Sequence, residues 1–260
     1  MKSAYALARR AGLLERHWFR RVYWHAYAAY KRTLEDPFAA LLRQQPSIAR
    51  GGSIADVGAH IGYTAMVFAR ALDPGFRVFA FEPDPANATL LRENLALEIA
   101  GGRVVPVEAA VGSASGKAEL MRSAAHPGDH RIGRAGRPLL EDRTPVTVSM
   151  LSLDEYFEAR APESLVLVKV DVQGFEIEVC LGMARTLDRG PVPWVAIEHS
   201  PAEAGSLGFD ARAVPAFLRE HGYTPRLLHR DGGTAPWPSP AAEALLARRG
   251  YVDLLCERNR

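Results

Sequence analysis

A glycine-containing turn near residue 60 is the first feature of this sequence that could carry chemistry. A short apolar run ends at Asp56 and is followed by Gly58 and Gly62, and apolar residues then recur at helical spacing over 63–72. This order is typical of a strand, a tight turn and a helix. Gly58 would let a ligand lie against the backbone, and the amides at the helix start would face an anionic group.

A second acidic strand end lies further along the chain. The apolar run 76–81 predicts a strand, and Glu82 follows it directly. A carboxylate at this point can accept hydrogen bonds from both hydroxyls of a ribose. Together with the glycine turn, Glu82 predicts a pocket for an adenosine-bearing ligand.

The glycine spacing favours S-adenosylmethionine over a dinucleotide. A dinucleotide turn needs Gly-x-Gly-x-x-Gly because the pyrophosphate sits on bare backbone, whereas this chain carries His60 between Gly58 and Gly62. S-adenosylmethionine has no pyrophosphate, and Asp56 can supply the carboxylate that its amino-acid end needs, directly or through water. The competing interpretation is a turn of the same shape that binds no ligand.

Strand and helix patterns alternate through the chain and predict the fold. Strands are indicated at 103–107 and 165–170, and Asp171 stands at the end of the second. In a parallel, doubly wound sheet the carboxyl ends of the strands share one edge, where ligands bind. We therefore predict an α/β domain over 51–260 with its acids on that edge. Further strands are indicated at 117–121, 145–150, 194–197, 225–228 and 251–256.

Residues 111–150 interrupt this alternation. Two short strands flank a polar segment that contains His126, Asp129, His130 and Arg131. A connection of this length inside a compact domain is more often functional or disordered than structural. We interpret it as a cover over the substrate site, with a merely mobile loop as the alternative.

The first 50 residues are predicted to form a helical extension. Aromatic residues recur at helical spacing over 4–31, and residues 1–32 carry a net charge of +7 against −5 for the rest of the chain. Such a helix suits a lid or a homodimer contact, and it also suits an anionic membrane surface. We favour the lid or dimer role over membrane contact.

Composition and cysteine usage bound the compartment and the partners. The chain has 260 residues, a net charge of +2 and two cysteines, Cys180 and Cys256, without metal-like spacing. This charge favours no particular partner, so we expect no nucleic acid, and two cysteines without a pairing pattern suit a reducing cytoplasm. We recognise neither a membrane-spanning run nor an export signal, and expect a cytoplasmic protein.

Five short motifs resemble the FkbM family of S-adenosylmethionine-dependent methyltransferases. They lie at Asp56–Thr64, Val78–Pro83, Ala110–Gly116, Leu153–Asp154 and Val168–Glu176, and the resemblance covers about residues 53–200. It implies a Rossmann-like class I methyltransferase fold, with a seven-stranded, mostly parallel sheet and helices on both faces. It also implies O-methylation of a small molecule or natural product, such as a polyketide, a sugar or a glycoconjugate.

Two residues depart from the family pattern. His60 stands where the family usually has Asn, and Gln173 where Glu is frequent, so a role that needs a negative charge at 173 is not expected. The cofactor contacts that we expect are Asp56, Gly58, Ala59, His60, Gly62, Tyr63, Thr64, Glu82, Pro83, Glu108, Ala109, Ala110 and Asp171.

Methyl transfer to an alcohol requires the oxygen to be held in line with carbon and sulfur, and a base helps to remove its proton. We consider Asp171, His199 and His130 as bases, with Glu198 binding substrate hydroxyls or orienting His199. Asp171 and His199 end adjacent predicted strands, and we favour Asp171 because it is nearest to the sulfonium by topology. No metal site is predicted, with Mg²⁺ between Asp171 and Glu198 as the alternative.

Two other functions are kept as alternatives. A nicotinamide-dependent oxidoreductase is disfavoured because the third glycine and a Tyr-x-x-x-Lys pair are missing. A non-catalytic module that retains the fold for binding would have lost its strand-end acids, but Asp56, Glu82 and Asp171 are all present. The identity of the substrate does not follow from the sequence.

Overall fold

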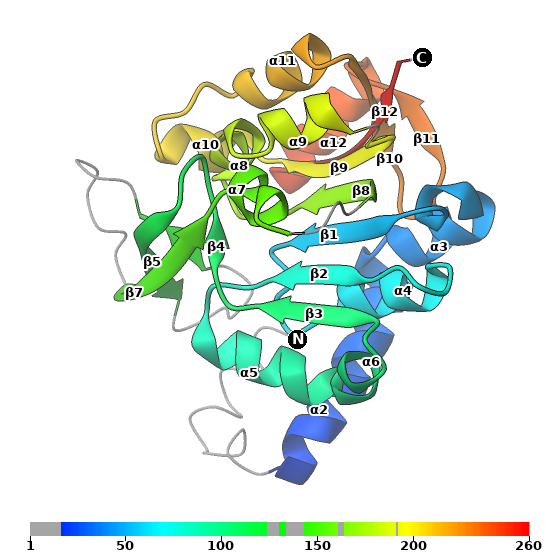
Figure 1. Ribbon diagram of the computed structural model, residues 1–260. Helices are drawn as coiled ribbons and strands as arrows, with labels where there is room; N and C mark the ends of the chain where they lie inside the picture. The colour runs from blue at the N-terminus through cyan, green and yellow to red at the C-terminus, as the bar shows by residue number, and fades with distance from the viewer. Residues whose placement is uncertain (1–16, 124–129, 134–142, 161–163, 191, 260) are drawn as a thin grey trace.

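The computed structural model describes residues 17–123, 130–133, 143–160, 164–190 and 192–259, and the statements below concern these ranges. A central sheet of eight strands has helices on both faces (Figure 1). From one edge to the other its strands are β11 (Thr234–Pro236), β10 (Tyr223–Leu228), β12 (Val252–Arg258), β9 (Trp194–His199), β8 (Leu165–Val170), β1 (Ser53–Val57), β2 (Val78–Phe81) and β3 (Val104–Val107).

The strand directions confirm the predicted fold class. Strands β9, β8, β1, β2 and β3 run parallel, while β12 is antiparallel to both β9 and β10. The sheet has one strand more than the seven expected, and the strand that no sequence pattern indicated is β11. Strand β11 pairs antiparallel with β10 at the sheet edge.

Side chains of the parallel strands alternate between two cores, one on each face of the sheet. Ala55 and Val57 of β1 point into one core and Ile54 into the other. The first core is closed by α7 (Leu153–Glu158), α8 (Glu176–Leu181), α9 (Ala184–Arg189), α11 (Ala213–Glu220) and α12 (Pro240–Arg249). The second is closed by α2 (His17–Tyr30), α3 (Phe38–Gln44), α4 (Tyr63–Ala71) and α5 (Pro85–Asn94).

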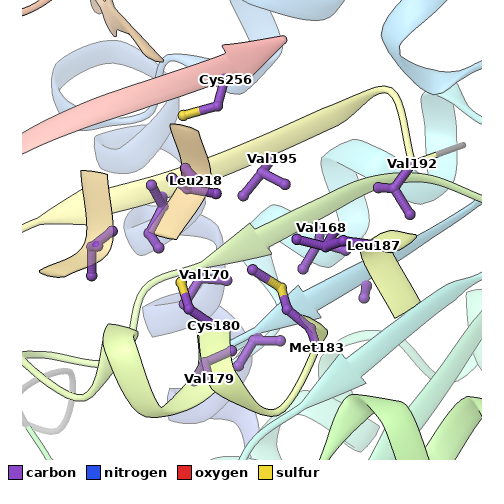
Figure 2. Packing of buried hydrophobic residues seen from close by; sticks show 14 of the residues in the cluster. Val168, Val170, Val179, Cys180, Met183, Leu187, Val192, Val195, Leu218 and Cys256 are labelled. Carbon is purple, nitrogen blue, oxygen red and sulfur yellow. The ribbon is translucent and has the colours of Figure 1, made fainter. Parts of the chain in front are cut away.

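The first core contains both cysteines of the chain. Figure 2 shows Cys180 among Val170, Val179 and Met183, and Cys256 above Val195. Both are free thiols with no exposed surface. They act here as small apolar side chains that fill the space between the sheet and the helices.

Two helix starts show how local sequence sets the chain direction after a strand. Asp84 caps α5 by accepting hydrogen bonds from the amides of Ala86 and Asn87, and Pro85 occupies the first turn. Ser152 caps α7 by accepting from the amide of Glu155. In a capping box the Glu155 carboxylate would accept a hydrogen bond from the Ser152 amide. Here the Ser115 hydroxyl takes that place, because it accepts from the Ser152 amide and donates to the Glu155 carboxylate.

Residues 110–151 form more structure than predicted. Strands β4 (Ala110–Val111), β7 (Arg143–Leu151), β5 (Gly116–Ser123) and β6 (Arg131–Ile132) make a second, four-stranded sheet in that order. The two strands expected here are confirmed and are longer, since β5 and β7 pair antiparallel over eight residue pairs. His126 and Asp129 lie outside the described residues.

The N-terminal extension packs into the second core. The predicted helix 4–31 is described from His17 onward as α2, and its residues 4–16 lie outside the described range. A π-helical turn, η2 (Lys31–Glu35), and a 3₁₀ turn, η3 (Pro46–Ala49), follow. Trp24 and Phe38 are buried, and the Phe38 ring meets the Phe68 ring of α4 edge-on at 5.2 Å.

No helix within the described ranges is long and apolar enough to cross a membrane. The short helices α6 (Ala96–Ala100) and α10 (Pro201–Ser206) complete the described elements.

The burial pattern predicts how two identical substitutions differ. Leu167 on β8 is fully buried, whereas Leu97 on α6 is 86% exposed. Leu167→Ala should lower the free energy of unfolding by about 2–5 kcal/mol, because it leaves a cavity in the core. Leu97→Ala should change it by less than about 0.5 kcal/mol. Urea denaturation of both variants checks this, and equal effects would contradict the packing described.

Candidate active site

A cavity of about 860 Å³ opens at the carboxyl ends of the parallel strands, the ends at which their arrowheads lie in Figure 1. Nine of the predicted site residues line it: Gly58, His60, Glu82, Pro83, Ala109, Ala110, His130, Asp171 and Glu198. Seven others do not: Asp56, Ala59, Gly62, Tyr63, Thr64, Glu108 and His199. The carboxyl edge of the sheet therefore brings together Gly58, Glu82 and Asp171, the residues that follow β1, β2 and β8.

The turn after β1 has no room for side chains at its first glycine. Gly58 has φ +79°, and a Cβ there would lie 1.9 Å from the Asp171 carbonyl oxygen. His60 also adopts a left-handed conformation, with φ +50°. Gly62, at φ +95°, precedes α4 and packs against Leu95, where a Cβ would lie 2.8 Å from Cδ1. The turn is consequently fixed by close backbone contact on two sides.

Lys169 connects the ends of β1 and β8 beneath this turn. Its Nζ atom lies 3.1 Å from Asp56 Oδ1 and donates to the Gly58 carbonyl at 3.0 Å. Burial alone would lower the pKa of Lys169, but the carboxylates of Asp56 and Asp171 outweigh it and raise that pKa. Asp56 is fully buried. Asp56 does not line the cavity and forms an ion pair with Lys169, and its contact with the cofactor, directly or through water, stays a prediction.

Glu82 organises the second strand end. Its carboxylate accepts hydrogen bonds from the amides of His60 at 2.9 Å and Asp84 at 3.0 Å, and from Asn87 Nδ2 at 3.4 Å. Burial raises the pKa of Glu82 to about 7. Glu82 thereby links the β1 turn to the start of α5 while its side chain lines the cavity.

A three-residue polar group lies on the other side of the cavity. Gln173 Nε2 donates to Asp171 Oδ1 at 3.0 Å and to Glu198 Oε1 at 3.2 Å. Gln173 reaches between the two carboxyl groups from a left-handed conformation, with φ +57°. The Asp171 side chain is 39% exposed to the cavity, and Lys169 Nζ lies 3.8 Å from its Oδ2.

The two carboxyl groups of this group differ in environment. Burial, together with the nearby carboxylates of Asp171 and Asp253, raises the pKa of Glu198 well above its ordinary value. The Ser200 hydroxyl donates to Glu198 Oε1 at 2.8 Å. Burial thus favours the protonated form of Glu198, whereas the Asp171 side chain is 39% exposed. Within the described ranges no group of three or more His, Cys, Asp or Glu side chains could hold a metal ion.

The predicted convergence of His199 with Asp171 is wrong. Strands β8 and β9 are adjacent and parallel as expected. Successive side chains of a strand point to opposite faces, and at the end of β9 Glu198 lines the cavity whereas His199 does not. His199 instead packs edge-on against Trp237 on the other face, with ring centroids 5.4 Å apart.

The remaining predicted cofactor residues lie around the cavity rather than in it. The Glu108 carboxylate forms an ion pair with Arg92 at 2.8 Å and is 40% exposed. Tyr63 and Thr64 belong to the first turn of α4, and Tyr63 points toward α2 and α3 in the second core.

The N-terminal extension forms one wall of the cavity. Tyr27 of α2 meets His60, with 3.2 Å between the phenol oxygen and Nδ1. Burial lowers the pKa of His60 to about 3, so its ring is neutral near pH 7. Lys31 and Glu35 of η2 form an ion pair at 2.8 Å and also line the cavity. These contacts place α2 and η2 in the wall of the cavity, and the lid role stays a prediction.

The second sheet forms another wall. His130 Nε2 lies 3.8 Å from Asp84 Oδ2, and Arg122 Nε lies 2.6 Å from the same oxygen. Arg131 of β6 forms an ion pair with Glu203 at 2.7 Å. Contacts with the start of α5 and with α10 therefore hold residues 130–133 at the wall of the cavity.

Several lining residues were not predicted from the sequence. They are Tyr23, Tyr27, Tyr30, Lys31, Glu35, Arg131, Gln173, Glu203, Arg249 and Tyr251. The aromatic spacing of α2 signalled a covered surface but not what it covers. Arg249 and Tyr251 flank the turn between α12 and β12, where no sequence pattern pointed to a site.

Known proteins with similar sequences identify the family to which this site belongs. The sequence model described as Methyltransferase FkbM domain matches residues 56–225. The hexuronic acid methyltransferase AglP of Haloferax volcanii is 34% identical over 64% of this chain, and the chain spans 60% of that relative's length. The 31-O-demethyl-FK506 methyltransferase FkbM of Streptomyces tacrolimicus is 28% identical over 70% of this chain and 76% of its own. A solved O-methyltransferase from Bacillus cereus, in complex with SAH, aligns over 92% of this chain and 90% of its own, with a TM-score of 0.47 and 13% identity.

Glu176 holds the loop that carries Asp171 and Gln173. Its Oε1 accepts from the amides of Gly174 at 3.0 Å and Val172 at 3.3 Å. Its side chain is buried, and this burial raises its pKa to about 7. Because the pKa is higher in the folded protein, this group's contribution to stability is present below about pH 4.5 and is lost as pH rises through about 7.

Glu176→Gln should remove this loss while keeping an oxygen acceptor for both amides. The free energy of unfolding of the variant minus that of the unmodified protein should rise by up to about 3 kcal/mol when the pH is raised from 5 to 8. Urea denaturation at both pH values measures the difference. The exposed Glu220→Gln is the control and should follow the unmodified protein, whereas a Glu176→Gln variant that did so would contradict the assignment.

Proposed function

The chain belongs to the FkbM methyltransferase family, and we propose that it transfers a methyl group from S-adenosylmethionine to a hydroxyl group of a small molecule or natural product. The observation that carries this proposal is the meeting of the Gly58 turn, Glu82 and Asp171 in one cavity. Its volume of about 860 Å³ falls in the range of about 300–1,000 Å³ usual for small-molecule sites.

The residues present fit S-adenosylmethionine. Gly58 lines the cavity, and only glycine fits there, because a Cβ would collide with the Asp171 carbonyl oxygen; the turn can therefore present its backbone to the amino-acid end. Glu82 is suited to the ribose hydroxyls, and Pro83, Ala109 and Ala110 give an apolar surface for the adenine. When bound, the cofactor supplies an electrophilic methyl group on a sulfonium.

Asp171 is the residue that we propose as base. Its carboxylate contacts the cavity, while Gln173 fixes its orientation through Oδ1 and Lys169 lies on the side of Oδ2. A hydroxyl of the acceptor would donate its proton to this carboxylate as the oxygen becomes a nucleophile. Glu198, holding a proton, would instead donate a hydrogen bond to another acceptor oxygen.

The extension and the second sheet would bind the acceptor. Tyr23, Tyr30 and Tyr251 offer aromatic surface, and Lys31, Arg131 and Arg249 offer donors for hydroxyl and carboxyl oxygens. The named relatives act on a hexuronic acid and on demethyl-FK506. These support a sugar, a glycoconjugate or a polyketide as the acceptor here.

The family assignment favours methyl transfer over the two alternatives, a nicotinamide-dependent oxidoreductase and a non-catalytic binding module.

We propose a cytoplasmic enzyme, since Cys180 and Cys256 are both free thiols, which persist in reducing compartments. A small-molecule acceptor and no nucleic acid remain the expected partners. Incubating hydroxylated metabolites with methyl-labelled cofactor and reading the products by mass spectrometry tests the proposal, which fails if no product gains the label.

Glu82→Ala should weaken S-adenosylmethionine binding by about 1.5–3 kcal/mol, the range for hydrogen bonds to a charged group. Calorimetric titration measures the change. Glu108→Ala is the matched control, because Glu108 forms its ion pair with Arg92 outside the cavity. Equal affinity of the Glu82 variant and the control would remove Glu82 from the cofactor site.

Asp171→Asn should lower the single-turnover rate by about 10²–10⁴-fold with little change in cofactor affinity, since a positioned base contributes this much. His199→Ala should keep its rate and its pH profile, because His199 faces the other side of the sheet. The acceptor found in the labelling screen serves as substrate. A His199 variant that loses the pH dependence, or an Asp171 variant that retains full activity, would reverse the assignment.

A further inference from the structure

A second cavity, of about 520 Å³, forms a groove on the outer side of the extension, between α2, α3 and α4. Its wall is apolar and comes from all three helices through Trp24, Ala28, Leu42, Met66, Val67 and Ala71. It shares no lining residue with the candidate active site. The two cavities use different faces of α2.

The polar residues that line the groove are basic. Arg32, Arg43 and Arg70 line it together with His25, and no carboxylate does so among the described residues. Arg70 has a distant partner, Glu98 at 3.9 Å. No described ion pair involves Arg32 or Arg43. The groove therefore combines an apolar wall with uncompensated positive charge.

A buried hydroxyl also lines the groove without a partner. Tyr63 is 4% exposed, and its phenol oxygen has no hydrogen-bond partner among the described residues. A buried donor left unpaired is costly, and the donors of the groove that a ligand reaches directly are the exposed guanidinium groups of Arg32 and Arg43. An oxyanion accepts from a phenol and from guanidinium groups alike.

We propose that the groove binds an anionic phospholipid at a bilayer surface. The phosphate oxygens accept from Arg32 and Arg43, while an acyl chain lies against the apolar wall. This binding goes beyond the proposed methyl transfer and does not depend on it.

Exposed apolar residues support a lipid surface rather than a free anion. Four large hydrophobic side chains stand out as exposed within the described ranges, and two of them, Val22 at 58% and Leu34 at 52%, belong to the α2 and η2 unit. Apolar and basic residues on one amphipathic helix are the combination that interfacial helices use. This proposal reverses our expectation from the sequence, which favoured the lid or dimer role over membrane contact.

Charge argues against the N-terminal segment as the occupant of the groove. Residues 1–16 carry Lys2, Arg9, Arg10 and Arg16 against Glu15, a net charge of +3. A segment of this charge would be repelled by the three arginines of the groove. An anionic partner from outside the chain complements them.

Co-sedimentation of the full chain with vesicles tests the proposal. Phosphatidylcholine vesicles containing phosphatidylglycerol should pellet the protein, and pure phosphatidylcholine vesicles should not. The double variant Arg32→Glu/Arg43→Glu should bind at least about tenfold more weakly, given the free energy of each basic residue near an anionic surface. Arg212→Glu/Arg248→Glu, an equal charge change at exposed sites on the α11 and α12 side, should bind within about twofold of the unmodified protein.

Ala71→Trp fills the groove without changing charge, and it should also weaken binding. Melting temperatures identify any variant that fails to fold. Binding that survives both groove variants, or that falls equally in the control pair, would overturn the proposal. Release by inorganic phosphate at constant ionic strength would identify a free anion as the ligand and would overturn it as well.

Discussion

The ends of β1 and β8 are held together by one buried ammonium group, and the candidate active site is built on that contact. Lys169 forms an ion pair with Asp56, donates a hydrogen bond to the Gly58 carbonyl, and lies 3.8 Å from Asp171 Oδ2. Leaving Lys169 without Asp56 would strand a buried charge, which is far more costly than losing a surface pair. Because the two strand ends are fixed in this way, the Gly58 turn and the Asp171 loop keep the spacing that a ligand between them needs.

The extension joins this site through one face and leaves another face outside. Tyr27 closes on His60, and its neighbours on α2 and η2 line the active-site cavity, while Trp24 and Ala28 border the outer groove. A ligand in the groove therefore touches the same helix that covers the site. A shift of α2 would change the shape of both the outer groove and the active-site cavity. Binding at the groove could therefore alter the acceptor cavity through this helix.

Sequence patterns predicted the parallel sheet, the glycine turn and most strand-end acids, because periodicity and glycine spacing depend on local backbone geometry. They did not separate Glu198 from His199, since both end the same strand and only the register decides which side chain faces the cavity. They did not reveal the ion pair of Asp56, because its partner Lys169 is 113 positions away. The walls formed by α2 and by the second sheet depend on tertiary packing, which no local pattern encodes.

The central claim is that the strand-end cavity binds a cofactor without pyrophosphate. Calorimetric titration of the protein with S-adenosylhomocysteine and, separately, with NAD tests it most directly. The account predicts saturable one-to-one binding of S-adenosylhomocysteine and no binding of NAD, because His60 occupies the position at which a pyrophosphate needs bare backbone. Binding of NAD, or failure of S-adenosylhomocysteine to bind a folded sample, would contradict it.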